Sequence, residues 1–328
     1  MRSGDGLLRA GRRASAAIGT TISSIAKCFR LAVQWLAGRS LLRLSLASIG
    51  RCAVLVWCVQ SVVNVRVRAL GVARYEMGRD LVGLDAASRL RTMSGCVLEG
   101  LLDRRLHLGR QANRDERWPD LQRIAGRLAA RIAELRRENA GRPVIVAPFH
   151  YVSQYANIYV VDELRVRLGI ERLSVVSGVP RDQYGDDAAL IPGIQVLYTY
   201  GDDNRGGLGM RFARALRRDG VAVLFADAPP FALHRYPMET VGVSMFDRPA
   251  RIHRGVFRIG APMDCALLPF YLTFEHGRFG ARIFEFVDLA SGDAPQRVAD
   301  LIALALTENY PASLVAGHPS MYAFSPAK

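Results

Sequence analysis

Residues 144–150 read Val-Ile-Val-Ala-Pro-Phe-His, a short apolar run that meets a proline and then a histidine. A continuous run of this length, rich in Val and Ile, is typical of a strand buried on both faces. We therefore expect a buried strand at 144–147, a turn at 148–150, and a helix from about Ser153 to Leu168. A strand that passes directly into a helix indicates an α/β fold.

The alternation continues on both sides of this stretch. Upstream, two helices are expected between 72 and 109, and Pro119 opens a third that runs to about Asn139, on an apolar stripe of Leu121, Ile124, Leu128, Ile132 and Leu135. Downstream, strands are expected at 173–177, 194–198, 221–225, 240–246, 265–272 and 282–286, with helices at 207–218, 252–259 and 297–308. This order predicts a mixed, largely parallel sheet flanked by helices.

Residues 1–70 differ from the rest of the chain. The first 72 residues hold eleven basic residues and a single acid, Asp5, whereas the whole chain of 328 residues has a net charge of +14. The most apolar part, 44–65, is long enough to cross a membrane but contains Arg51. The sequence therefore predicts a basic tail and a helical membrane-anchoring segment at 1–70, followed by one α/β domain at 71–328. A transmembrane span, a surface anchor and a plain core helix all remain open.

Several function classes lack support in this sequence. The five cysteines are scattered without a CxxC pair, and His253 and His276 have no ligand spacing to another His or Cys, so we expect no metal site. Neither a GxGxxG after a strand, nor a GxxxxGK[ST] loop, nor a GxSxG elbow occurs. A nucleic-acid-binding protein would depend on the N-terminal charge alone, because no aromatic-basic motif accompanies it. We therefore expect no nucleic-acid partner.

Two polar residues follow predicted buried strands, His150 after the strand at 144–147 and Asp227 after the strand at 221–225. Chemistry in open α/β sheets gathers at the carboxyl ends of strands. A neutral imidazole in such a turn can take a proton from a hydroxyl group. The plainer alternative for His150 is a structural histidine with its hydrogen bonds satisfied.

Four blocks of this sequence resemble the lipid A biosynthesis acyltransferases, within the lysophospholipid acyltransferase-like superfamily. The blocks follow the family's order and cover about residues 75–325. They are 144–151 around His150, 216–230 around Asp227, 242–262, and the C-terminal pair 308–311 and 322–324. The likeness implies the α/β fold already expected and agrees with a basic N-terminal anchor.

The family's central motif is a His followed, after four residues, by Asp or Glu, which orients and charges the histidine. Here the motif histidine is His150, but Tyr155 stands where the acid belongs. A phenol is neutral at pH 7, although it could accept a hydrogen bond from the ring. Asp227 is a more plausible substitute for the missing acid. Ala228 also departs from the family, which places Gln after this Asp.

The resemblance implies an acyltransferase that moves a fatty acyl group from a thioester to a lipid hydroxyl or amine, with a lipid A-type acceptor favoured. The donor would be acyl carrier protein or coenzyme A, used as co-substrate with no further cofactor. His150 would be the general base, Tyr155 and Asp227 its partners, and Arg248 and Arg251 would hold phosphate oxygens of the donor. The expected location is the cytoplasmic face of the inner membrane. The alternative is a catalytically impaired relative that binds lipid or acyl carrier protein as an accessory factor.

Overall fold

The computed structural model describes residues 38–112, 118–177, 191, 193–198, 207–230 and 239–316. The chain divides into two units, 1–44 and 45–328, and everything below concerns the second. Most of the predicted basic tail, at 1–37, lies outside the described residues, as does the end of the fourth block at 322–324. Helix α2 (Leu46–Val63), which comes from the segment expected to anchor the protein, belongs to the same unit as the sheet.

Within the described residues, seven strands form the main sheet in the order β3-β2-β4-β1-β7-β8, with β9 also paired to β7. Neighbours among β1, β2, β3, β4 and β7 are parallel, and β8 and β9 are antiparallel to β7. The strands are β1 (Val144–Pro148), β2 (Leu173–Ser177), β3 (Ile194–Tyr198), β4 (Val221–Leu224), β7 (Ala266–Glu275), β8 (Arg278–Ile283) and β9 (Val287–Asp288). The predicted mixed, largely parallel sheet is confirmed.

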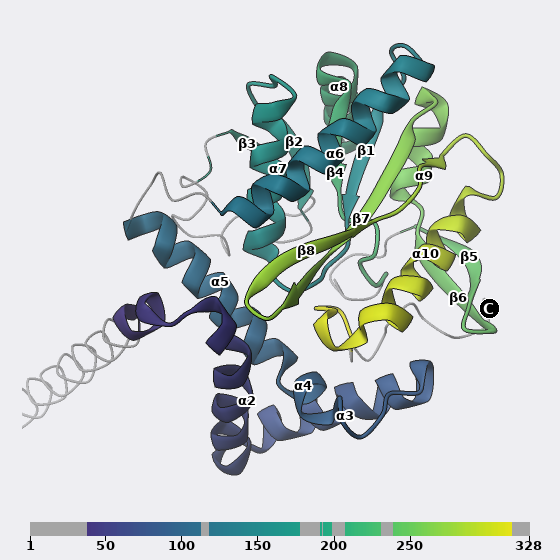
Figure 1. The fold of residues 1–328 in the computed structure, drawn as a ribbon. Helices are drawn as coiled ribbons and strands as arrows, with labels where there is room; N and C mark the ends of the chain where they lie inside the picture. Colours follow the sequence, from purple (N-terminus) through teal and green to yellow (C-terminus); the bar gives the residue numbers. More distant parts are fainter. Residues whose placement is uncertain are drawn as a thin grey trace, which may run out of the picture. The chain divides into compact units, whose positions relative to one another are not determined.

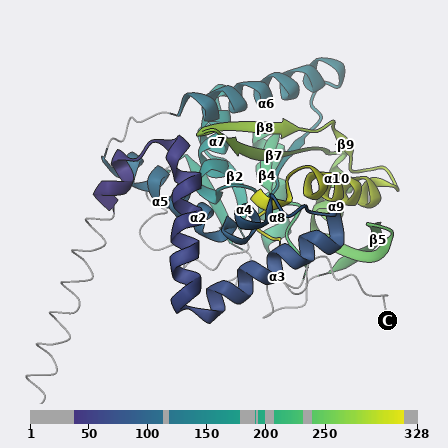
Figure 2. The same ribbon diagram turned by 60° about the horizontal axis from the view of Figure 1, so that its bottom comes forward.

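Helices cover both faces of this sheet (Figures 1 and 2). The chain crosses from β1 to β2 in one direction and from β3 to β4 in the other, so right-handed crossovers place α7 and α8 on opposite faces. Helix α6 packs beside α7, and its predicted apolar stripe is buried. The helices are α6 (Pro119–Glu138), α7 (Gln154–Arg167), α8 (Leu208–Asp219), α9 (Gly255–Gly260) and α10 (Ala294–Asn309). With both faces covered, every residue of β1 is buried.

Two β-hairpins correct the predictions for the later part of the chain. The expected helix at 252–259 is present as α9 (Gly255–Gly260), but its first two expected residues belong instead to strand β6 (Arg248–His253), which pairs with β5 (Thr240–Met245). The expected strand at 282–286 is shifted back to β8. Both hairpins turn through two residues of positive φ, Phe246 and Asp247 in one, His276 and Gly277 in the other. Such turns are favoured by Asn and Gly, so Phe-Asp gave no turn signal in the sequence.

A helical layer precedes the sheet in the chain. It consists of α2, α3 (Val65–Val82), α4 (Arg89–Met93) and α5 (Gly95–Ala112). The sequence predicted a helical anchoring segment within 1–70 and two helices between 72 and 109. Helices α2 and α3 meet closely because Gly71 has no side chain: a Cβ there would lie 2.8 Å from Trp57 Nε1. Helix α3 reaches the strand ends through Arg74, a buried side chain that donates hydrogen bonds to the carbonyl oxygens of Pro311, Ser313 and Ala316.

Candidate active site

The register of two neighbouring strands brings His150 and Asp227 together. Val144 of β1 pairs with Val221 of β4, and the strands run parallel. His150 and Asp227 each lie six residues beyond this pair. The two side chains therefore leave the sheet at the same edge, the carboxyl ends of β1 and β4, where α/β proteins place their sites.

Two hydrogen bonds join these residues. His150 Nδ1 lies 2.7 Å from Asp227 Oδ1, and the backbone N–H of His150 donates to Asp227 Oδ2 over 2.6 Å. The Asp227 side chain is 1% exposed and that of His150 is 18% exposed. The ring of Phe225 lies beside the imidazole, with centroids 4.6 Å apart. Asp227 therefore fixes both the position of the turn and the proton at Nδ1, and Nε2 is the ring nitrogen that can exchange a proton with a substrate.

The turn that carries His150 is held by the C-terminal segment. Val152 has a φ of 67°, a left-handed conformation that is rare for a β-branched residue. The backbone N–H of Val152 donates to Ala312 O over 2.8 Å, and Leu314 N–H donates to His150 O over 2.7 Å. Ser153 then caps α7 by accepting from the backbone N–H of Ala156 at 3.0 Å. Strain of this kind persists where surrounding contacts fix it, which is common at functional sites.

The environment of His150 favours its protonated form. Burial alone disfavours the imidazolium and would lower the pKa of His150. The Asp227 charge and hydrogen bond, together with the charge of Glu99, outweigh burial and raise this pKa above its ordinary value. A base with a raised pKa binds the transferred proton more firmly, but it is neutral and ready to act only at a correspondingly higher pH.

Helix α5 supplies two further carboxyl groups that sequence reasoning missed. Burial, and after it the charge of Asp103, raises the pKa of Glu99 to about 7, although Arg74 and His150 act in the opposite direction. Burial also raises the pKa of Asp103, against the hydrogen bonds from Ser153 Oγ and from Tyr155 N–H, the latter 3.4 Å long. Within the described residues, Glu99 forms no hydrogen bond or ion pair. The available sequence signal was their four-residue spacing on one helix face, but nothing local connected that face to His150.

The structure places Tyr155 on the α5 side of the turn. Its backbone N–H faces Asp103, and its ring lies 5.5 Å from the ring of His107 and 6.3 Å from that of Tyr159, centroid to centroid. The partner at Nδ1 of His150 is Asp227. The substitute acid suggested by the sequence, Asp227, is therefore the group that lies at Nδ1, whereas Tyr155 lies on the other side of the turn.

Arg248 and Arg251 lie in the β5–β6 hairpin. Arg248 forms an ion pair with Asp80 of α3 over 3.1 Å, with both side chains exposed. The Nε of Arg251 donates to Thr240 Oγ1 across the hairpin over 2.7 Å. These contacts join the hairpin to α3 and to itself, and the role of the two arginines in holding a donor stays a prediction.

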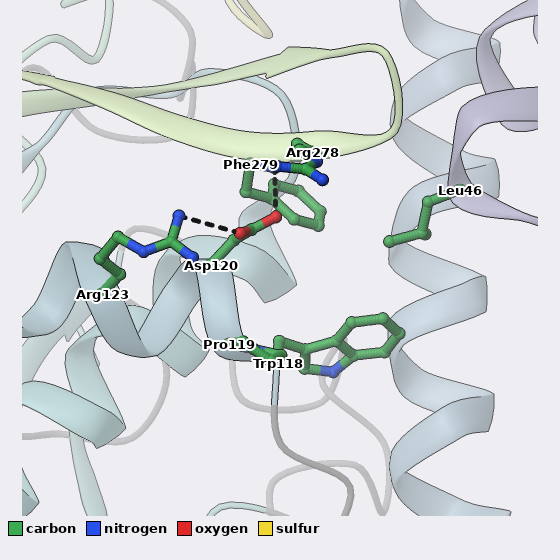
Figure 3. A pocket seen from close by; sticks show the side chains of 7 residues that line it. All are labelled: Leu46, Trp118, Pro119, Asp120, Arg123, Arg278 and Phe279. Atoms are coloured by element: carbon green, nitrogen blue, oxygen red, sulfur yellow. Dashed lines mark hydrogen bonds and ion pairs between the residues drawn. The ribbon is translucent and has the colours of Figure 1, made fainter.

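A cavity of about 270 Å³ lies at the start of α6 and the β7–β8 hairpin (Figure 3). Asp120 lines it and is engaged on both sides, by Arg123 and by the backbone N–H of Phe279, each at 3.3 Å. The other lining residues are Leu46, Trp118, Pro119 and Arg278. Neither His150 nor Asp227 borders this cavity. Among the described residues, no group of three His, Cys, Asp or Glu side chains is placed to hold a metal ion.

No protein-family model matches this chain. No curated protein is similar to it at a significant level. The geometry of the site is therefore the basis for the function proposed next.

Proposed function

We propose that this protein is a membrane-associated acyltransferase in which His150 and Asp227 form the general-base pair. The acyl group would come from a thioester of acyl carrier protein or coenzyme A and pass to a lipid hydroxyl or amine, with a lipid A-type acceptor favoured. The observation that carries the proposal is the double hydrogen bond between Asp227 and His150 at the carboxyl ends of β1 and β4. This pairing supplies the oriented and charged histidine that such chemistry needs, without the acid that Tyr155 replaces.

The step proceeds through Nε2 of His150. Nε2 takes the proton of the acceptor hydroxyl as its oxygen attacks the thioester carbonyl carbon. The C–S bond then breaks, and the thiolate leaves with the proton that the imidazolium returns. Asp227 stabilises the imidazolium between these events, because its carboxylate is held at 2.7 Å from Nδ1 in a buried setting. A base of this kind typically contributes about 10²–10⁴-fold to the rate.

The surroundings of the pair suit this role. The His150 side chain is mostly enclosed but retains some access, whereas Asp227 is sealed from solvent. Phe225 shields one side of the ring, and the C-terminal segment holds the turn in a conformation that its sequence alone disfavours. An ordered, partly desolvated base is what acyl transfer to a poorly nucleophilic hydroxyl requires. In this proposal Arg248 and Arg251 hold the donor's phosphate oxygens, and the enzyme works at the cytoplasmic face of the inner membrane.

The test is an acyl-transfer assay with the full chain in detergent. Acyl carrier protein and coenzyme A thioesters are each offered with a lipid A precursor, a lysophospholipid and an amine-bearing lipid, and products are identified by mass spectrometry. We expect transfer by wild type and a loss of about 10²-fold or more in His150→Ala. The matched control is His276→Asn, which removes an exposed imidazole in a turn of positive φ that Asn tolerates.

Two results would contradict the proposal. Wild type that transfers no acyl group with any pair of substrates, while still binding lipid or acyl carrier protein, would favour the accessory factor. His150→Ala as active as wild type would remove His150 from the mechanism.

A further inference from the structure

Exposed apolar side chains gather where α2 passes into α3. We call this set the elbow patch: Leu55, Val59, Val62, Val63, Val65 and Leu70. Val62 and Val63 are 80% and 82% exposed, which makes them the most exposed large apolar residues of the described chain. The other exposed apolar residues, Leu90, Val166, Met210 and Leu304, are scattered over four different helices. A concentrated apolar surface marks a contact with a partner or a membrane, whereas scattered ones need no explanation.

Helix α2 is apolar on two opposite faces. Ile49, Ala53 and Trp57 lie on one face and are buried against the protein. Leu55 and Val59 lie about half a turn away and are exposed. A helix that is apolar all round needs a second apolar environment for the face that the protein leaves uncovered.

The elbow is a fixed structure. Asn64 ends α2 and begins α3, and its Oδ1 accepts hydrogen bonds from the backbone N–H groups of Arg66 and Val67, at 3.0 and 3.3 Å. The apolar residues on either side of Asn64 are thus presented on a capped turn. Folding therefore orders this surface before any partner is bound.

Only basic charges accompany the patch. Arg51, Arg66 and Arg68 are all exposed, and the sequence has no acid between Leu46 and Tyr75. Exposed apolar side chains with interspersed arginines match the boundary between acyl chains and anionic headgroups. The patch and its charges suit the surface of an anionic bilayer better than a second copy of this chain, because two basic patches would repel each other.

The packing of α2 opposes a membrane span. Over the described residues, α2 is the one helix long and apolar enough to cross a bilayer. Its 18 residues would extend about 27 Å, close to the thickness of the hydrocarbon core. A span would, however, carry the face of Ile49, Ala53 and Trp57 into lipid and break its packing against Gly71 of α3.

We propose that the elbow patch docks on an anionic phospholipid bilayer without crossing it, and that α3 joins this contact to the His150 turn. From Val65 to Arg74 is nine residues, or about 14 Å of helix. Arg74 holds the segment at 311–316, and that segment in turn holds His150 and Val152. The docked state thereby keeps the site close to the membrane surface and supports a substrate that is itself a bilayer lipid. This last point about the substrate rests on the proposed function, but the docking does not.

Vesicle flotation of the full chain tests the docking. Vesicles of phosphatidylcholine alone are compared with vesicles in which about a third of the lipid is anionic phosphatidylglycerol. We expect the double variant Val62→Gln, Val63→Gln to bind anionic vesicles about 10-fold less than wild type, because two apolar side chains no longer enter lipid. Arg66→Gln with Arg68→Gln should reduce the preference for anionic vesicles. The matched control is Val166→Gln with Leu304→Gln, which makes the same chemical change at two scattered exposed sites and should bind as wild type does.

Three outcomes would overturn the proposal. The first is unchanged vesicle binding in the Val62, Val63 variant with a wild-type circular dichroism spectrum and melting temperature. The second is lipid-free wild type that sediments as a dimer while that variant sediments as a monomer, which would make the patch an interface between copies. The third is wild type that does not float with either kind of vesicle. His150→Ala should still bind vesicles, so a failed acyltransferase assay and a failed docking assay give separate answers.

Discussion

On the strand side of His150, Asp227 is sealed from solvent and bonded to both the ring and the backbone of its partner. On the helix side, Glu99 of α5 is half-buried without a hydrogen bond or ion pair among the described residues, and burial raises its pKa to about 7. Two carboxyl groups thus act on the imidazole of His150 in different ways. Asp227 is positioned by direct bonds, whereas Glu99 acts through space and only when it is ionised. Asp227 therefore orients the imidazole of His150, whereas Glu99 adjusts how readily this imidazole becomes charged.

The largest effect should follow from breaking the strand side. Asp227→Asn places an amide beside Nδ1, so the ring loses its charged partner and can adopt the other tautomer. We expect acyl transfer to fall by about 10²–10⁴-fold and the pKa of His150 to fall towards its ordinary value. Activity comes from the transfer assay, and the pKa from NMR titration of the imidazole.

The matched control for this change is Asp120→Asn. Asp120 also accepts a backbone N–H, from Phe279, but it lies in the cavity at the start of α6. Its variant should keep wild-type activity. Full activity in Asp227→Asn would show that the pairing of Asp227 with His150 has only a structural role, and the strand side would then not orient a catalytic base.

Arg74 provides the next largest effect, on stability. This buried guanidinium donates to three carbonyl oxygens of the segment that holds the His150 turn. Arg74→Met leaves those carbonyls without their donor, and we expect a loss of about 2–4 kcal/mol in the free energy of unfolding. Chemical denaturation measures it, with Arg79→Met as control, since Arg79 lies on the same helix in an exposed pair with Glu76. Equal stability of the two variants would mean that α3 does not hold the turn.

The strand side could be predicted from the sequence, and the helix side could not. A buried apolar run that ends in a polar residue identified both His150 and Asp227. The alternation of predicted strands and helices along the chain indicated a largely parallel sheet. Sequence does not reveal that β1 and β4 are neighbours in register, so their pairing was only a suggestion. Glu99 and Arg74 lie in helices whose approach to the strand ends depends on tertiary packing. At Gly95, for example, a Cβ would lie 2.8 Å from a nitrogen of Arg74.

A smaller effect should follow from removing the charge of Glu99. Ionised Glu99 raises the pKa of His150, so Glu99→Gln should lower this pKa and move the acid limb of kcat/KM to lower pH. Because Glu99 itself titrates near pH 7, the wild-type limb should be broader than that of the variant. Glu138→Gln, at the end of α6, is the control and should leave the profile unchanged. An acid limb of kcat/KM at the same pH in Glu99→Gln and in wild type would mean that Glu99 does not influence the charge of His150.

The same carboxyl predicts a pH dependence of stability. The pKa of Glu99 in the folded protein, about 7, lies above its ordinary value of 4.5, so the folded state holds this proton more firmly. Ionisation of Glu99 therefore lowers the free energy of unfolding as pH rises through this window. Between about pH 5 and about pH 8, wild type should lose more stability than Glu99→Gln does. A change of one in pKa corresponds to about 1.4 kcal/mol in the free energy of unfolding. Because the Glu99 side chain is partly exposed, the measured loss of stability should be smaller than this conversion of its pKa change gives. Parallel urea titrations at the two pH values give the comparison, and identical losses in both proteins would contradict the burial of an unpaired carboxyl.

Tyr155 should give the smallest effect and separates the two sides most sharply. Its backbone N–H, which substitution leaves in place, is the group that faces Asp103, and Nδ1 of His150 is already occupied by Asp227. Tyr155→Phe removes only the hydroxyl and keeps the ring contacts with His107 and Tyr159, so we expect activity within about threefold of wild type. A loss of activity comparable to that of Asp227→Asn would mean that Tyr155, at the motif position, orients His150 instead of Asp227 at the strand end. The double variant with Asp227→Asn then decides the matter: non-additive losses would mean that both residues act on the same imidazole, and additive losses that they act apart.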